Sequence, residues 1–361
     1  MGRKHIFNAG PGALPVPVLE QAQAELVDFR GKGLSVLEMS HRSSDFEGIL
    51  GRANTALREL LAIPDTHEIL WLQGGASGQF AQVPLNFLKP GQTAAYAVTG
   101  VWGQKAIKEA KLLGDAVVAA STEEGGFRRV PDPSELRVPP GAAYLHITTN
   151  NTIYGTQWRT IPDAGDVPLV ADLSSDFLSR PVDVGRYALI YAGAQKNLGP
   201  AGVTIVIVRK DWVAQARTDI PVIWRYATHL KENSLYHTPP VFAIYLSGLV
   251  LDLLVAQGGL AAVEATNERK AQRLYGVIDG SQGFFRGHAE PGSRSRMNVT
   301  FRLPTEELEK ELLAEASAAG MIGLKGHRSV GGMRASIYNA VPEASVEALA
   351  DLMLDFARRR A

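Results

Sequence analysis

The sequence has no cysteine among its 361 residues. Disulfide bonds, thiolate metal sites and cysteine nucleophiles are therefore excluded. A chain without disulfides suits a reducing compartment, so we expect a cytoplasmic protein. We also expect no metal site.

The sequence has no excess of either charge and no long apolar run. Lys and Arg together number 37, as do Asp and Glu, so we expect neither nucleic acid nor an anionic membrane surface as a partner. The longest apolar stretch, residues 241–256, carries Ser247 and Asp252 and is too short to span a bilayer. Residues 1–8 lack the apolar core of a signal peptide. We expect a protein that does not enter a membrane.

Short apolar segments alternate with helix-forming segments from about residue 17 to 250. Pro17 can open a helix that runs to about Phe29. Strands are predicted at residues 68–72, 93–98, 116–120, 142–148, 169–172, 187–191 and 203–208. The alternation predicts an α/β fold with a largely parallel sheet covered by helices on both faces. Residues 241–256 and 260–275 predict two further helices, and a compact α+β lobe follows from about residue 281.

One lysine, Lys196, lies among small residues between the predicted strands 187–191 and 203–208. An unpaired ammonium is costly to bury, so a lysine held between two buried strands is unusual. One use for it is as an amine nucleophile that forms a Schiff base with an aldehyde. That chemistry needs an electron sink, and pyridoxal 5′-phosphate (PLP) is one.

Five side chains share a position after a predicted strand: Ser77, Trp102, Thr152, Asp172 and Lys196. Ligands of parallel sheets gather at that edge. There an aspartate could keep a pyridine nitrogen protonated, a tryptophan could stack on a ring, and the Gly-rich turn at residues 74–79 could bind a phosphate. Each feature also has a plain structural explanation, as a helix cap, a packed core side chain or an ordinary turn.

A set of cationic residues forms a second group, consisting of His41, Arg42, His327, Arg328 and Arg334. Arginine binds carboxylate or phosphate through two parallel hydrogen bonds. The set therefore suggests a substrate with at least two anionic groups, although scattered surface charge is the simpler alternative. Arg42 and Arg328 are far apart in the sequence, so only the tertiary fold or a dimer could bring them together.

The segment around Lys196, AGAQKNLGPAGV at residues 192–203, resembles the phosphoserine aminotransferase family, a group of class-V PLP enzymes of fold type I. Similar motifs occur over nearly the whole chain, at residues 7–12, 40–42, 73–76, 83–86, 172–176, 238–240, 245–249 and 326–336. The resemblance implies a large domain at residues 16–256 with a mostly parallel seven-stranded sheet. It also implies a smaller α+β domain at residues 257–361, with residues 1–15 joining the two.

The resemblance implies a role for each cofactor-site residue. Lys196 would carry one PLP per subunit as a Schiff base and would move the substrate proton, and Asp172 would pair with the pyridinium nitrogen. Trp102 would stack on the ring, and Thr152 would lie beside its phenolic oxygen. Three residues would hold the cofactor phosphate, namely Ala76, Ser77 and Gln195.

The resemblance also implies a homodimer with active sites at the subunit interface, because Thr238 and its neighbour His237 would reach the phosphate of the partner subunit. The family usually has asparagine at the position of His237. Because histidine can be protonated and asparagine cannot, the contact of His237 with the phosphate becomes pH-dependent. Some members of the family have a basic residue in place of Ser77. Without that positive charge, the affinity of this protein for a substrate phosphate is in doubt. Arg334 would bind the substrate α-carboxylate. The distal phosphate or γ-carboxylate would meet His41, Arg42, His327 and Arg328.

The implied reaction moves an amino group reversibly from L-glutamate to 3-phosphohydroxypyruvate, giving 2-oxoglutarate and O-phospho-L-serine for serine biosynthesis. The family also makes 4-phosphohydroxy-L-threonine for pyridoxine biosynthesis. Another class-V aminotransferase, such as the serine–glyoxylate type, is the nearest alternative. A PLP-binding regulator would need a DNA-binding module, for which no segment is free, and a nicotinamide dehydrogenase would need a glycine fingerprint that is missing.

Overall fold

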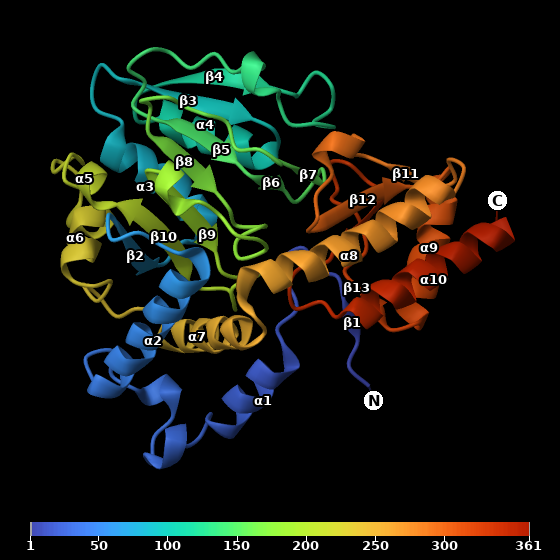
Figure 1. Cartoon of the computed structure of the whole chain (residues 1–361), viewed down its shortest axis with the longest axis horizontal. Helices are drawn as coiled ribbons and strands as arrows, with labels where there is room; N and C mark the ends of the chain where they lie inside the picture. The colour runs from blue at the N-terminus through green and yellow to red at the C-terminus, as the bar shows by residue number, and fades with distance from the viewer. Residues whose placement is uncertain (1, 361) are drawn as a thin grey trace.

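A seven-stranded sheet is the largest element of the computed structural model, which describes residues 2–360 (Figure 1). In spatial order its strands are β2 (His67–Leu72), β10 (Thr204–Arg209), β9 (Leu189–Gly193), β8 (Leu169–Asp172), β5 (Leu145–Thr148), β3 (Thr93–Val98) and β4 (Asp115–Ser121). Strand β10 is antiparallel to both neighbours, and the other pairings are parallel. The predicted mostly parallel sheet is confirmed.

The central strands are buried along their whole length because helices cover both faces of the sheet. Strands β5, β8 and β9 are buried at every residue. On one face, α2 (Ser44–Leu61) packs against α7 (Val241–Ala256). On the other face, α3 (Gly75–Phe87) packs against α4 (Val101–Lys111), with α5 (Lys210–Val213) and α6 (Tyr226–Lys231) beside them.

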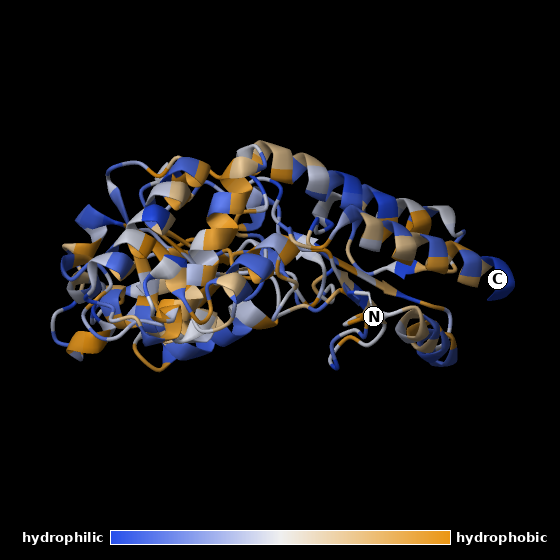
Figure 2. Cartoon of the chain, turned by 90° about the horizontal axis from the view of Figure 1, so that it is seen from below, coloured by the Kyte–Doolittle hydropathy of each residue, from blue (hydrophilic) through white to orange (hydrophobic). Residues whose placement is uncertain are grey.

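The C-terminal part has its own hydrophobic cluster, which includes Leu274, Val299, Ala335, Leu349 and Phe356. Its elements are α8 (Gly259–Gly280), α9 (Glu306–Ala318), α10 (Glu343–Arg360) and a sheet of β11 (Arg286–Gly287), β12 (Asn298–Arg302) and β14 (Met333–Ser336). Figure 2 shows these helices at the end of the elongated chain opposite the large sheet. We call this part the C-terminal unit. Whether the domain boundary falls at residue 256 stays a prediction.

The N-terminal segment pairs with the C-terminal unit. Strand β1 (His5–Ile6) lies parallel to β13 (Met321–Ile322), and the chain then continues into α1 (Val16–Ala24). The predicted helix from Pro17 to Phe29 is therefore too long. After Ala24 the chain leaves the helix, and the amide of Phe29 donates to the carbonyl of Leu34 in a separate turn.

Two other predicted elements need correction. The strand predicted at residues 142–148 starts only at Leu145, because the amide of Ala142 closes a turn with Pro139. The helix predicted at residues 260–275 runs on to Gly280. Within residues 2–360, no single helix has the length and apolarity to cross a membrane. Taken as a pair, helices α7 and α8 have that length and apolarity, by length and composition only, but the chain bends by 86° at the break between them.

Candidate active site

A cavity of about 470 Å³ lies at the carboxyl edge of the large sheet, facing the C-terminal unit. It collects most of the residues that the sequence singled out: Ala76, Ser77, Trp102, Thr152, Asp172, Gln195, Lys196, His327 and Arg334. It is also lined by residues to which the sequence assigned no role: Ala9, Gly10, Thr148, Asn150, Ile153, Ser174 and Ser175. Residues remote in the chain therefore meet at one point, as expected for strand ends of an α/β sheet.

Lys196 lies on the hairpin between β9 and β10 and points into this cavity. Its Nζ donates a hydrogen bond to Oγ1 of Thr152 at 2.8 Å and lies 5.8 Å from the ring centroid of Trp102. Burial lowers the pKa of Lys196 to about 8, an effect that the charge of Asp172 opposes and that of Arg334 adds to. An amine with this pKa is partly unprotonated near neutral pH, as a nucleophile requires.

The N-terminal loop forms part of the cavity wall. The amide of Gly12 donates to the carbonyl of Gln195 at 2.7 Å, and a Cβ at Gly12 would lie 2.9 Å from the backbone oxygen of Lys196. The hydroxyl of Tyr338 donates to the carbonyl of Ala9 at 2.7 Å. Gly12 is therefore needed for close backbone approach, and the sequence offered no signal of this beyond the motif itself.

Asp172 ends β8 and is buried. Its Oδ1 accepts the amide of Ser174 at 2.8 Å. Burial raises the pKa of Asp172, while the Ser174 hydrogen bonds and the charge of Lys196 oppose that rise. A second buried carboxylate, Asp176, accepts from Thr149 and Gln157 and was given no role from the sequence.

The start of α3 offers hydrogen-bond donors to an anion. The helix begins after Gly74, which has a φ of 94°, and no side chain among residues 2–360 caps it. Its first backbone N–H groups therefore remain free to bind a phosphate, beside Ala76 and Ser77. His237 and Thr238 approach the same turn from outside: the ring Nε2 of His237 lies 3.3 Å from Oε1 of Gln73. Neither residue lines the cavity that holds Lys196 in its own chain.

The structure divides the cationic residues into two sets. Arg334, on β14, and His327 line the cavity, and Nη1 of Arg334 donates to the carbonyl of Thr152 at 3.4 Å. Burial lowers the pKa of Arg334, and burial together with the charge of Arg334 lowers the pKa of His327. His41, Arg42 and Arg328 do not line this cavity, so one described chain does not assemble the whole predicted cluster.

The chemical groups that line the cavity fit PLP. Lys196 offers an amine, Asp172 a buried carboxylate, and the start of α3 a set of backbone donors. Within residues 2–360, the buried Nε1 of Trp102 and Nε of Arg334 also have no hydrogen-bond partner. Unpaired buried donors are costly, so these two favour a bound polar ligand.

Sheet, cavity lysine and buried aspartate together are those of a PLP-dependent enzyme of fold type I. Residues 5–349 match the family model of the class-V aminotransferases. The chain belongs to that family and, within it, to the phosphoserine aminotransferases, because relatives of that name match it over its full length at more than half identity. The resemblance inferred from the sequence is confirmed.

The relatives agree in sequence and in structure. A phosphoserine aminotransferase of Lysinibacillus sphaericus is 56% identical over 99% of each chain. The solved phosphoserine aminotransferase of Bacillus circulans subsp. alkalophilus is 53% identical, covers 99% of each chain and has a TM-score of 0.98. A PLP-bound phosphoserine aminotransferase from Trichomonas vaginalis is 36% identical, with a TM-score of 0.93 over 98% of this chain and 100% of its own.

Proposed function

We propose that this chain is a PLP-dependent aminotransferase acting between L-glutamate and 3-phosphohydroxypyruvate, with O-phospho-L-serine and 2-oxoglutarate as products. The observation that carries the proposal is the shared cavity of Lys196 and Arg334, in a chain whose full-length relatives are phosphoserine aminotransferases. Both amino-group donor and acceptor bring an α-carboxylate, which one arginine can bind in turn. Use of the same site for 4-phosphohydroxy-L-threonine in pyridoxine biosynthesis is part of the proposal.

Residues of one cavity would hold one PLP per subunit. When bound, PLP supplies an aldehyde that captures amines and a ring that accepts electrons. Lys196 would attach to it covalently, Asp172 would pair with its ring nitrogen, and Trp102 would lie on its face. Its phosphate would accept hydrogen bonds from the backbone N–H groups at the start of α3, and Ala76, Ser77 and Gln195 would hold it there. Thr152 would lie beside its phenolic oxygen.

The protein's own groups would do the rest of the chemistry. Arg334 orients the α-carboxylate through two parallel hydrogen bonds, which places the substrate Cα near the amine of Lys196. That amine would move a proton between the substrate Cα and C4′ of PLP. Its pKa of about 8 suits this work, because a catalytic base is most effective near the working pH.

A homodimer would complete the site. The residues left outside the cavity, among them Arg42 and Thr238, would then serve the partner subunit. An exposed apolar group adjoins His237: Val222, Ile223, Trp224 and Tyr236 are 38–43% exposed. Such groups mark contact surfaces. Light scattering on wild type and Trp224→Lys would test this, and a monomeric wild type would contradict it. The cytoplasmic location stays a prediction that cell fractionation would check.

The decisive test is a coupled assay of glutamate with 3-phosphohydroxypyruvate against unphosphorylated hydroxypyruvate and glyoxylate. We expect kcat/KM for the phosphorylated acceptor to exceed the others by at least about a hundredfold, since hydrogen bonds between charged groups contribute about 1.5–3 kcal/mol each. Equal rates with glyoxylate would favour the serine–glyoxylate type. Lys196→Ala should abolish both the reaction and the yellow absorbance of the protein.

A further inference from the structure

Two buried asparagines meet where the C-terminal unit joins the seven-stranded part. Asn150 lies in β6 (Asn150–Asn151), which forms a hairpin with β7 (Thr156–Gln157), and Asn298 is the first residue of β12. Nδ2 of Asn150 donates to Oδ1 of Asn298 at 2.7 Å. Both residues are at most 2% exposed. A direct hydrogen bond between buried amides therefore crosses this junction.

The remaining polar atoms of the pair are also bonded. Asn150 donates its second amide hydrogen to Oγ of Ser175 at 2.8 Å and accepts from the hydroxyl of Ser295. Asn298 donates from Nδ2 to Oγ of Ser336 at 2.9 Å and to the hydroxyl of Tyr338 at 3.3 Å. A buried network with every donor used has one low-energy arrangement and resists displacement.

The two ends of this network are the two halves of the candidate active site. Ser175 lines the cavity on the loop that follows Asp172. At the other end, Ser336 lies two residues after Arg334 on β14, and the register of β12 and β14 pairs Asn298 with Ser336. The hydrogen bonds thus run continuously from the loop of Asp172 to the strand of Arg334.

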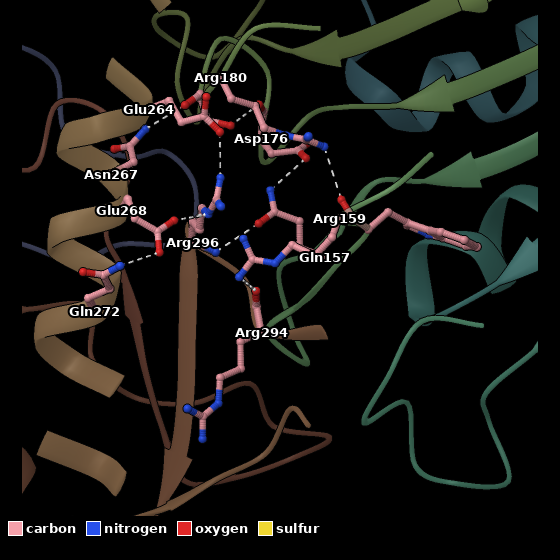
Figure 3. Close-up of polar contacts among 12 residues, drawn as sticks. Gln157, Arg159, Asp176, Arg180, Glu264, Asn267, Glu268, Gln272, Arg294 and Arg296 are labelled. Carbon is pink, nitrogen blue, oxygen red and sulfur yellow. Dashed lines mark hydrogen bonds and ion pairs between the residues drawn. The ribbon is translucent and has the colours of Figure 1, made fainter. Parts of the chain in front are cut away.

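A second bridge crosses the junction through Gln157 (Figure 3). Nε2 of Gln157 donates to Oδ2 of Asp176 at 3.1 Å, and its Oε1 accepts the backbone amide of Arg296 at 3.0 Å. The guanidinium of Arg296 pairs with Glu264 and Glu268 on α8. Arg296, just before β12, is therefore held by Gln157 through its backbone and by α8 through its side chain.

We propose that Asn150, Asn298 and Gln157 are positioning residues that set the distance between Arg334 and the cofactor side of the cavity. This inference rests on the proposed function, in which Arg334 binds the α-carboxylate while Asp172 and Lys196 hold PLP. Small displacements of a substrate anchor cost large factors in rate and binding, because the reacting atoms leave the productive geometry. The buried bridges keep that geometry through hydrogen bonds within the protein itself.

The test compares Asn298→Leu with Asn54→Leu in the PLP-loaded enzyme. Asn54 accepts the indole N–H of buried Trp71 at 2.7 Å, so its loss also leaves a buried polar group unpaired, but it lies outside the cavity. Calorimetry measures 2-oxoglutarate binding, fluorescence measures PLP binding to the apoenzyme, and steady-state assays give KM for glutamate and 3-phosphohydroxypyruvate. Thermal unfolding reports stability.

For Asn298→Leu we expect 2-oxoglutarate to bind at least tenfold more weakly and both KM values to rise by a similar factor, because both substrates use Arg334. The Kd for PLP should change less than threefold, since the proposed cofactor contacts all belong to the seven-stranded part. Asn54→Leu should lower the Tm but leave 2-oxoglutarate binding within twofold of wild type.

A folded Asn298→Leu that binds 2-oxoglutarate within twofold of wild type would overturn the inference, and so would an equal loss in Asn54→Leu. If Asn298→Leu does not fold, Gln157→Met carries the same expectation through the second bridge. A wild-type enzyme that transfers no amino group from glutamate to 3-phosphohydroxypyruvate would instead refute the proposed function, so the two failures are distinguishable.

Discussion

The ammonium of Lys196 and the hydroxyl of Thr152 are joined by a hydrogen bond of 2.8 Å, although 44 residues separate them in the chain. Thr152 follows β6, and Lys196 follows β9. The bond holds the amine in the cavity. There the negative charge of Asp172 raises the pKa of the amine, and the positive charge of Arg334 lowers it. The reactivity of Lys196 is therefore a property of the folded site.

The rate at which the apoenzyme captures PLP should follow the deprotonation of Lys196. Its pKa is lowered to about 8, so the reactive amine becomes the major form above that pH. Below it the rate should fall about tenfold per pH unit, and above it the rate should level off. Stopped-flow absorbance would measure this, and a midpoint near the ordinary lysine value would contradict it.

Two variants should move that midpoint in opposite directions. Arg334 lowers the pKa of Lys196, so Arg334→Met should raise the midpoint. Asp172 raises the pKa of Lys196, so Asp172→Asn should lower it. Shifts of the same sign in both variants would mean that these charges do not act on the amine.

Gly12→Ala should destabilise the site. The new Cβ would lie 2.9 Å from the backbone oxygen of Lys196 and 3.0 Å from Cδ2 of Tyr338, and neither can move freely. We expect a loss of about 1–3 kcal/mol in unfolding free energy and weaker PLP retention. Gly51→Ala is the matched control, because at this exposed site in α2 no atom of the described chain lies within 4 Å of the added Cβ, and the variant should gain up to about 1 kcal/mol.

Lys270→Met should lower the unfolding free energy by about 3 kcal/mol. The buried Nζ of Lys270 donates to three carbonyls, those of Ile337, Tyr338 and Val341, which would lose their donor. Denaturant unfolding measures the change. Lys310→Met, at an exposed position on α9, should stay within about 0.5 kcal/mol of wild type. Similar losses in the two variants would contradict the prediction.

Arg42→Ala should weaken phosphorylated substrates far more than PLP. Arg42 is exposed and lies outside the cavity of its own chain, so we expect it to act on the partner's substrate. Removing one charged hydrogen-bond partner should raise KM for 3-phosphohydroxypyruvate by roughly tenfold or more. Parallel PLP titrations provide the comparison, and equal losses for substrate and cofactor would argue against a substrate role.

Sequence periodicity predicted the sheet well because its central strands are buried on both faces and are mostly apolar. Residues 93–98 and 169–172 form strands with the predicted bounds. The helix after Pro17 was predicted too long because no local signal marks its end at Ala24, where the chain turns back through the Phe29–Leu34 hydrogen bond. Tertiary contacts decide such boundaries.

The candidate site, like the fold, was predicted from the sequence only in part. Position after a strand was enough to single out Ser77, Trp102, Thr152, Asp172 and Lys196, because strand direction alone brings these ends to one edge. The roles of Gly12, Asn150 and Asn298 lie in contacts made across the fold, which no local pattern encodes.

The sequence by itself determined the fold class, the family and the chemical types of the site. Amino-acid composition, strand periodicity and long motifs around Lys196 all depend on residues close together in the chain. Only the tertiary structure decided the pKa of Lys196, the division of the cationic residues between cavity and surface, and the buried amides between Asp172 and Arg334. These properties depend on burial and distance between remote segments, which arise only when the chain has folded.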